Sequence, residues 1–373
     1  MVHNAPVRKR SSYALLLVSL STLPSGCDRL KSALANEPPP AVLPVSPDPG
    51  GEWLHTERNH LLLGASPFHG RGANLQDTRS CDACSFEASH PEEVLRRVDE
   101  LTDRWHANFL RLTLESYDKA DRRVTWRGAL MDDAYLKDLQ RIVHRIEQKP
   151  GVYVELAVWH DPSLDKMGWP TDETRKLWEK LVHTFAESPR VLFGVATEPE
   201  QNADGKMDAY AWDAMNKTVE TIRAAEGGGP HHIVVVQGTR MWARRLDYYV
   251  SHPITAGGGF DIAYESHTYD GHPQIDALLD GPAKTLPVII GEFGPVDDAH
   301  LAHMTMDDCS YLMQRAEERE VPYLAWTFHM RCPPNLLVDK SGGSCGVGMP
   351  LEPTPWGKLL RDRLAQPYGA PGH

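Results

Sequence analysis

The sequence predicts an α/β protein whose main part, residues 52–373, is one (β/α)8 TIM barrel. Short apolar runs recur along this part, and segments with helical periodicity lie between them. Eight strands that alternate with helices imply parallel pairing through right-handed crossovers, and the length suits eight such units. The alternative is an open doubly wound sheet, but the glycine-rich phosphate turn that often begins such a sheet is missing.

The strands are predicted from runs rich in Val, Ile, Leu and aromatic residues. Runs of this length and composition are typical of strands that are buried on both faces of a parallel sheet. The eight predicted strands cover residues 60–66, 108–114, 153–159, 191–197, 232–238, 260–267, 286–292 and 322–328.

Helical periodicity is clearest over residues 132–148, where apolar side chains from Tyr135 to Ile146 fall on one face. Thr171 precedes a periodic run and is a plausible helix start. The helices after the fifth and sixth strands are expected to be short. The remaining predicted helices cover residues 92–106, 172–187, 208–225, 297–319 and 354–365.

Charge and composition exclude several classes of protein. The chain has 373 residues with 39 Lys and Arg against 51 Asp and Glu, a formal net charge of −12. This balance argues against a nucleic-acid-binding protein, because phosphate contacts need clustered basic side chains. Hydrophobic residues make up 41% of the chain, which is enough for a large core. No apolar run approaches the roughly 20 residues that a membrane-spanning helix needs.

The N-terminal segment has the features of an export signal. Basic residues 8–10 precede a short apolar run over residues 13–23, which is too short to span a membrane. The following Ser-Gly-Cys resembles the lipobox of bacterial lipoproteins, although Pro24 stands where Leu is usual, and the resemblance implies that Cys27 is lipidated. We therefore expect a signal peptide over residues 1–26, a proline-rich tether over 27–51, and a cell-envelope or secreted location.

Polar residues gather at the predicted strand ends, where the active sites of TIM barrels are found. The third, fourth, sixth and seventh strands each end in a group with acid, base or hydrogen-bonding chemistry. In chain order the candidate site residues are Arg111, His160, Thr197, Glu198, His267, Tyr269, Glu292 and Trp326.

Two glutamates that face each other across a barrel mouth suit cleavage of a glycosidic bond. One carboxyl group protonates the leaving oxygen and the other stabilises the oxocarbenium-like transition state from the opposite face. Arg111 and Tyr269 are expected to hydrogen-bond one carboxylate and keep it ionised, so that the second has a raised pKa and acts as the acid. Trp326 would provide an apolar platform for a sugar ring.

The strings FLRL, WHD, TEP, HTY and IIGEFG, together with the late Trp326, resemble the cellulase family of glycoside hydrolases, family 5 of clan A, over residues 60–330. The resemblance implies a retaining double displacement with Glu292 as nucleophile and Glu198 as acid/base, and no cofactor or catalytic metal. The other positions that it implies are Arg111 and Tyr269 as partners of the nucleophile, and His160, His267 and Trp326 as the lining of the sugar subsite.

Thr197 departs from the family pattern, which has an asparagine that binds the sugar 2-hydroxyl. The expected reaction is hydrolysis of a β-linked glycan by a monomer, with β-1,4-glucan as the first substrate class and β-mannan next. Because a threonine hydroxyl cannot replace both groups of an amide, two alternatives stay open. One is a non-catalytic glycan-binding lipoprotein, and the other is a transglycosylase.

Several further residues have two interpretations each. Trp159, Trp169 and Trp242 could form outer sugar subsites or pack in the core, and Asp161 and Glu265 could support the site residues from behind.

The cysteine pairing is open, because five cysteines follow Cys27. Cys332 and Cys345 flank a loop after the last strand and could close it, Cys81 and Cys84 could form a disulfide, and Cys309 is the best candidate for a buried free thiol. The loops over 67–91 and 329–352 are expected to flank the barrel mouth.

Overall fold

The computed structural model describes residues 41–76, 90–114, 130, 132–158, 169–198, 202–298, 302–344 and 346–370. Residues 40–373 form one compact unit. The predicted signal peptide and Cys27 lie outside the described residues, as do Cys81, Cys84 and Cys345. Within the described part of the chain, no helix has the length and apolarity required to cross a membrane.

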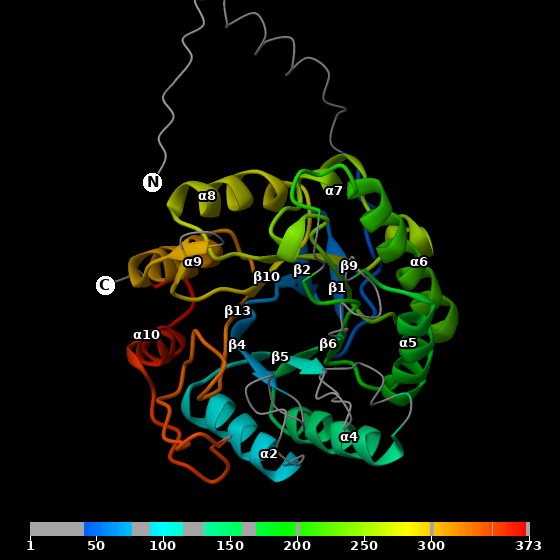
Figure 1. The fold of residues 1–373 in the computed structure, drawn as a ribbon. Helices are drawn as coiled ribbons and strands as arrows, with labels where there is room; N and C mark the ends of the chain where they lie inside the picture. The colour runs from blue at the N-terminus through cyan, green and yellow to red at the C-terminus, as the bar shows by residue number, and fades with distance from the viewer. Residues whose placement is uncertain are drawn as a thin grey trace, which may run out of the picture. The chain divides into compact units, whose positions relative to one another are not determined.

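Eight parallel strands close into a barrel ringed by helices, which confirms the predicted fold (Figure 1). The order around the barrel is β10-β13-β4-β5-β6-β7-β8-β9, so consecutive strands are neighbours and the last strand, β13, pairs with the first, β4. The barrel strands are β4 (Arg71–Gln76), β5 (Phe109–Leu114), β6 (Tyr153–Val158), β7 (Val191–Gly194), β8 (Val234–Gln237), β9 (Ile262–His267), β10 (Val288–Glu292) and β13 (Tyr323–Ala325).

Two of the longer helices begin with side-chain caps that the sequence offers. Asp132 accepts hydrogen bonds from the amides of Ala134 and Tyr135, and Thr171 forms a reciprocal capping box with Thr174. The helix that follows β8 has only five residues, as expected for the fifth unit. The α-helices are α2 (Pro91–Asp99), α4 (Asp133–Glu147), α5 (Asp172–Phe185), α6 (Asp208–Glu226), α7 (Asp247–Ser251), α8 (His272–Asp280), α9 (Met306–Glu318) and α10 (Pro355–Leu364).

The predicted first strand over 60–66 was wrong. These residues form β2 (His60–Leu63), which pairs antiparallel with β1 (Leu54–Glu57) and β3 (Ser66–Pro67) in a small separate sheet. The first barrel strand is β4, which lies inside the segment predicted as a loop. Its sequence, RGANLQ, hides this role because the strand has polar buried side chains and a glycine where an apolar run was expected.

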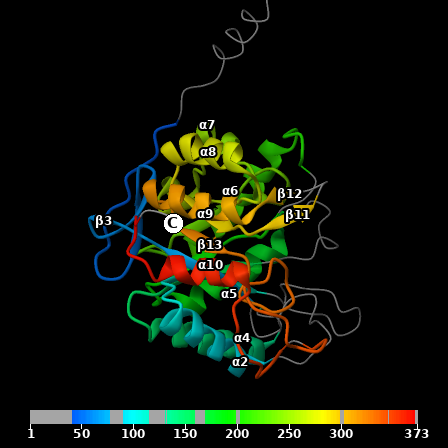
Figure 2. The same ribbon diagram turned by 90° about the vertical axis from the view of Figure 1, so that its left-hand side faces the viewer.

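The two ends of the barrel differ in their chemistry. Leu54 and Leu61 from the small sheet, together with Phe68 just after it, pack against the apolar starts of the barrel strands, such as Phe109 and Tyr153. Figure 2 shows β3 at one end of the molecule and β11 (Val296–Asp298) with β12 (Ala302–Met304) at the other. The small sheet therefore covers the N-terminal end of the barrel, and the opposite end carries the strand termini.

The predicted helix over 297–319 begins later than expected. The β11–β12 hairpin comes first, and α9 starts only after Thr305, whose hydroxyl accepts a hydrogen bond from the amide of Asp308. Residues before β1 also pack on the barrel, since the Ser46 hydroxyl accepts a hydrogen bond from the amide of Asp261 at 3.0 Å. Cys309 is a buried free thiol, as predicted, and Cys332 is disulfide-bonded.

Candidate active site

The candidate residues that the structure describes converge at the C-terminal end of the barrel. Glu292 and His267 are the last residues of β10 and β9, and Arg111 lies within β5. Thr197 and Glu198 follow β7, Tyr269 follows β9 and Trp326 follows β13. His160, with Trp159 and Asp161, lies outside the described residues.

Glu292 is held by two hydrogen-bond donors. Arg111 Nη1 donates to Glu292 Oε1 at 3.0 Å, and the Tyr269 hydroxyl donates to Glu292 Oε2 at 3.0 Å. The side chain of Glu292 is only 5% exposed. Each oxygen therefore has its own partner, and the carboxyl group is fixed in one orientation at the end of its strand.

Arg111 joins several strands through a fully buried guanidinium group. Its Nη2 donates to the hydroxyl of Thr197 at 3.0 Å, and its Nη1 also donates to Asn74 Oδ1 at 3.0 Å. Its Nε lies 3.2 Å from Glu265 Oε1 and 3.4 Å from Glu155 Oε1. Burial alone would lower the pKa of Arg111, but the surrounding carboxylates raise it, so this cation is permanent.

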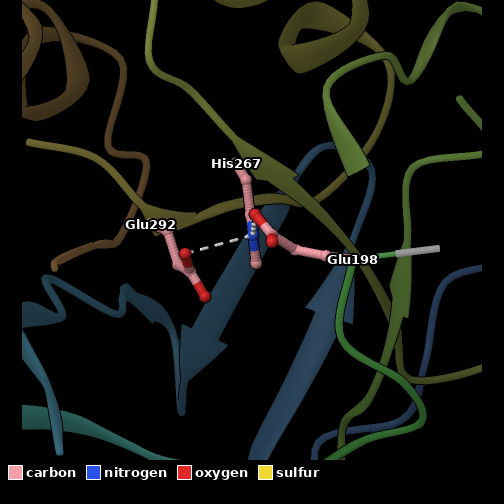
Figure 3. Close-up of side chains that lie close together, drawn as sticks. All are labelled: Glu198, His267 and Glu292. Atoms are coloured by element: carbon pink, nitrogen blue, oxygen red, sulfur yellow. Dashed lines mark hydrogen bonds and ion pairs between the residues drawn. The ribbon is translucent and has the colours of Figure 1, made fainter. Parts of the chain in front are cut away.

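His267 lies between the two candidate glutamates (Figure 3). Its Nδ1 is 2.9 Å from Glu198 Oε1 and 3.4 Å from Glu292 Oε2. Its Nε2 is 2.6 Å from Glu265 Oε1. Burial opposes a charge on the imidazole, but the nearby carboxylates outweigh it and raise the pKa of His267 to about 9. A ring protonated on both nitrogens donates one hydrogen bond to Glu198 and one to Glu265.

The protonation of Glu292 differs from the expectation. The two predicted donors are present, yet burial raises the pKa of Glu292 to about 7, and the negative charge of Glu198 adds to the rise. His267 and Arg111 act in the opposite direction. Removal from water, together with the charge of Glu198, thus outweighs what the donors contribute, because a carboxylate in a dry site loses its hydration.

Glu198 differs from Glu292 in its surroundings. Its side chain is 31% exposed, so it reaches the solvent at the barrel mouth. Its backbone has a φ of 49°, in the left-handed region that residues with a side chain seldom occupy. Such a conformation costs energy and persists where the surrounding structure holds it in place.

The tryptophan candidates differ in their exposure and in their neighbours. Trp326 is half-buried beside the end of β13, and its backbone carbonyl accepts a hydrogen bond from the indole of Trp356. Trp169 is 1% exposed and packs on Tyr210, so it belongs to the core and cannot contact a sugar face in this position. Trp242 is half-buried with the Arg244 guanidinium 5.5 Å from its ring centre.

Two residues that contact Arg111 were missed by the sequence analysis. Asn74 lies in β4, and its amide donates to the carbonyl oxygen of Gly291 at 2.8 Å while its oxygen accepts from Arg111. Glu155 lies in β6 and is fully buried. A signal for both was present, since a polar side chain within a buried strand requires a partner, but Asn74 could be found only once β4 was recognised as a strand.

One atom from each of Glu198, His267 and Glu292 lies within 4.8 Å of the other two. This spacing would also suit a metal ion. However, both oxygens of Glu292 already accept hydrogen bonds, one from Arg111 and one from Tyr269. We therefore interpret the cluster as an acid–base site.

Comparisons with known proteins agree with this arrangement. The family model described as Cellulase (glycosyl hydrolase family 5) matches residues 69–331. The comparison with curated proteins finds no match.

Solved structures with the same fold include enzymes with different named activities. A Thermobifida fusca endoglucanase catalytic domain in complex with cellotetraose has 17% identity and a TM-score of 0.62, covering 84% of this chain and 97% of its own. A Saccharophagus degradans β-glucanase has 19% identity and a TM-score of 0.63, with coverages of 89% and 98%. A mannanase catalytic domain from Streptomyces sp. SirexAA-E has 21% identity and a TM-score of 0.62, with coverages of 90% and 96%. At these identities the likeness shows the fold alone.

Proposed function

The chain belongs to glycosyl hydrolase family 5, and from this we propose that it is a retaining β-glycosidase that acts on a β-linked glycan. The observation that carries the proposal is the placement of Glu198 and Glu292 around His267, with oxygens that lie within 4.8 Å of each other. Carboxyl groups of retaining glycosidases lie about 5–5.5 Å apart, whereas inverting enzymes separate them by about 6.5–9.5 Å to admit a water molecule. The short spacing supports the retaining reaction.

In the first step, an oxygen of Glu292 attacks the anomeric carbon and forms a glycosyl ester. The bond between that carbon and the leaving oxygen breaks, and Glu198 transfers its proton to the leaving oxygen. Arg111 and Tyr269 hold the attacking carboxylate in place. The greater exposure of Glu198 fits its role, because an acid that must also reach a water molecule needs access to the cleft.

In the second step, Glu198 accepts a proton from water, and the oxygen of that water attacks the anomeric carbon. The ester bond to Glu292 breaks, and the configuration of the sugar is retained after two inversions. His160 and Trp326 would line the subsite for the attacked sugar, and Thr197 would face its 2-hydroxyl. Water supplies the atoms of hydrolysis, so the scheme needs no cofactor.

For the substrate we propose a β-1,4-glucan first and a β-mannan second. The named activities of the structural neighbours include both an endoglucanase and a mannanase. We further propose that the protein acts outside the cytoplasm as a monomer, on a lipid anchor at Cys27 that follows the signal peptide and the proline-rich tether.

A non-catalytic glycan-binding protein is the second candidate, because Thr197 stands where the family has an asparagine. Its oxygen accepts a hydrogen bond from Arg111 Nη2, which leaves the hydroxyl hydrogen free to donate. A sugar 2-hydroxyl can thus be met by one donor where an amide would offer a donor and an acceptor. This arrangement supports a weakened site better than a lost one.

The test is release of reducing ends by the purified protein from a panel of β-glucans, β-mannans and xylans. We expect release from at least one β-glucan or β-mannan, and none above the blank for Glu292→Ala. No release from any glycan, with bound oligosaccharide detected by calorimetry, would favour the binding protein. A product longer than the substrate after addition of an acceptor sugar would indicate the transglycosylase.

The two glutamates can be distinguished by the leaving group. Glu198→Ala should lower glycan hydrolysis by about 10²–10⁴-fold, the usual contribution of a general acid. It should lower the first step much less with a dinitrophenyl glycoside, because dinitrophenolate departs without protonation. Glu292→Ala should abolish both reactions, and equal sensitivity of the two variants to the leaving group would contradict the assignment.

A further inference from the structure

A polar layer lies inside the barrel directly below the active site. Side chains of a strand alternate between inside and outside, and those of a TIM barrel fill the interior in layers. The layer near the strand starts is apolar and includes Phe109 and Tyr153. Two positions further along the same strands, the interior contains Arg111 and Glu155, both 0% exposed.

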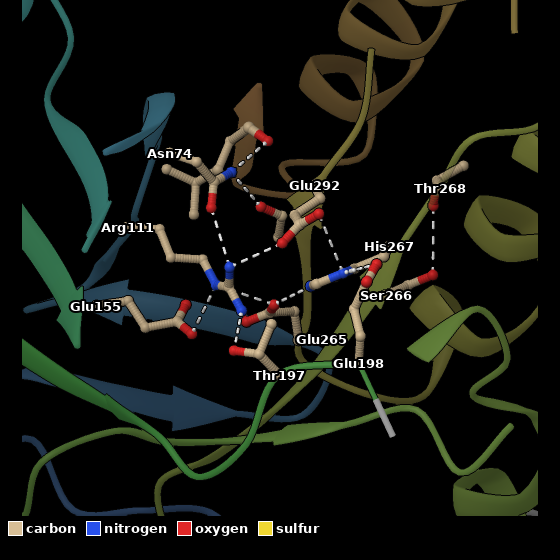
Figure 4. A network of polar contacts seen from close by, with 12 residues as sticks. Asn74, Arg111, Glu155, Thr197, Glu198, Glu265, Ser266, His267, Thr268 and Glu292 are labelled. Carbon is tan, nitrogen blue, oxygen red and sulfur yellow. Dashed lines mark hydrogen bonds and ion pairs between the residues drawn. The ribbon is translucent and has the colours of Figure 1, made fainter. Parts of the chain in front are cut away.

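Two buried carboxyl groups, Glu155 and Glu265, share this layer with one arginine (Figure 4). The Arg111 Nε lies 3.4 Å from Glu155 Oε1 and 3.2 Å from Glu265 Oε1. The barrel makes room for them with glycines: a Cβ atom at Gly194 would collide with the Glu155 carboxyl, and one at Gly291 with the Glu265 carboxyl. Both carboxyl groups therefore occupy space inside the barrel that is open only because these two residues have no side chain.

The two carboxyl groups have different neighbours. Glu265 Oε1 also contacts His267 Nε2 at 2.6 Å, whereas Glu155 contacts Arg111 and Glu265. Burial raises the pKa of Glu155 well above its ordinary value, and the charge of Glu265 raises it further. Burial also opposes the charge of Glu265, but Arg111 and His267 lower its pKa below the ordinary value.

We propose that Glu265 is the ionised counter-ion that holds His267 as an imidazolium against Glu198, and that Glu155 is its protonated, neutral neighbour. Glu265 is thus a positioning residue that acts through His267, which in turn donates to Glu198 Oε1 at 2.9 Å. The role of this contact in positioning Glu198 for catalysis rests on the proposed function. The charge of the imidazole does not, because it is a property of the free protein.

The charged groups around His267 come from five strands or the loops that follow them. Among the described residues, the carboxyl groups of Glu198, Glu265 and Glu292 contact the ring. Arg111, Tyr269 and Glu155 lie one contact further away, each bonded to one of these carboxyl groups. Glu265 is the one of the three contacting carboxyl groups that is bonded to Nε2, so its removal leaves that N–H facing a buried neutral group.

The experiment compares Glu265→Gln with Glu155→Gln by NMR titration of histidine side chains labelled with ¹⁵N. The two substitutions are chemically identical, occur in one layer and contact the same guanidinium. We expect the midpoint of His267 in the Glu265 variant to fall by at least about one pH unit, because a counter-ion at hydrogen-bond distance is lost. In the Glu155 variant the midpoint should stay within about 0.3 pH unit, because an amide replaces a neutral carboxyl group.

Three outcomes would overturn the proposal. The first is an unchanged His267 midpoint in Glu265→Gln, and the second is an equal fall in both variants, which would mean that the negative charge is shared. The third is a wild-type midpoint at or below the ordinary histidine value of about 6.5. The signal of His267 is assigned from its absence in His267→Asn.

A variant that fails to fold does not prevent the test. Glu265→Asp keeps the negative charge, so its His267 midpoint should remain above the ordinary histidine value, and the wild-type titration alone can overturn the proposal. The titration needs no substrate. A protein without hydrolytic activity would therefore contradict the proposed function and leave this inference standing, while a low His267 midpoint in an active enzyme would do the reverse.

Discussion

Thr197 is the residue at which the site differs from its family. Its contacts indicate how much transition-state stabilisation the threonine can still provide. Its hydroxyl oxygen accepts from Arg111 Nη2 at 3.0 Å, and the residue is only 6% exposed. Hydrogen bonds to the sugar 2-hydroxyl strengthen in the transition state of glycosidases. A single hydroxyl that is already engaged by a guanidinium can contribute part of this stabilisation.

We predict that Thr197→Asn raises kcat/KM on the best glycan by about tenfold, which corresponds to about 1.4 kcal/mol for one additional transition-state hydrogen bond. The asparagine oxygen can keep the Arg111 contact while its NH₂ group offers the substrate two donors, where the threonine hydroxyl offers one. Thr197→Val is the matched control, since it keeps the shape and removes the hydroxyl, and it should lower kcat/KM. A loss of activity in both variants would mean that the site is built around threonine.

The raised pKa of Glu292 predicts the acid side of the pH profile. Burial places this pKa at about 7, and the nucleophile reacts only as the carboxylate. Below that pH, kcat/KM should therefore fall about tenfold for each pH unit. His267→Asn removes a positive charge that lowers the pKa of Glu292, so the acid limb of its normalised profile should move to higher pH. A wild-type limb below pH 5 would show that the donors outweigh burial.

At the scale of elements, the strands that were predicted correctly are those whose outward side chains, which pack in the core outside the barrel, are mostly apolar. β5, β6, β7, β8, β9, β10 and β13 all lie within their predicted ranges. β4 was missed because its inward positions hold Asn74 and Gln76, and because Gly72 approaches the carbonyl of Phe109 too closely for any Cβ atom. A search for apolar runs finds strands with several large apolar side chains, and it fails for β4, whose one large apolar residue is Leu75.

Gly291 lets β10 pass the carboxyl group of Glu265, and this close approach predicts the effect of a methyl group. Gly291→Ala should destabilise the protein by about 1–3 kcal/mol through overpacking, because the added Cβ collides with a fully buried side chain. Urea unfolding measures the change. Gly228→Ala is the control, since nothing lies within 4 Å of its Cβ position. Equal stability of the two variants would show that Glu265 can move aside.

For the whole molecule, the sequence predicted the barrel and the strand ends that carry the site, because both follow from local patterns and the geometry of parallel strands. It did not predict the charges inside the barrel. The relation of Glu155 and Glu265 to Arg111 depends on three strands coming together and on the space left by Gly194 and Gly291. Such distances between distant residues are fixed only when the barrel closes.

The seam where the barrel closes has its own buried charge, Glu317 at the end of α9. Its carboxyl group contacts Arg71 of β4 at 3.2 Å and Arg363 of α10 at 2.6 Å, and it accepts a hydrogen bond from the hydroxyl of Tyr323 in β13 at 2.8 Å. β4 and β13 are the first and last strands of the barrel. One carboxylate thus joins both strands of the seam to two outer helices.

We predict that Glu317→Gln lowers the free energy of unfolding at pH 7 by about 3–5 kcal/mol, since it leaves buried arginines without their counter-ion. Burial opposes the charge, but Arg363 and the other donors lower the pKa of Glu317. A lowered carboxyl pKa stabilises the fold above the unfolded value of about 4.3 and loses this effect as the pH falls. The deficit of the variant, measured by urea unfolding, should therefore shrink towards pH 3.

Glu318→Gln is the control, because the neighbouring Glu318 is 46% exposed and its ion pair with Arg315 lies at the surface. If the two substitutions cost the same, the seam does not depend on its buried charge.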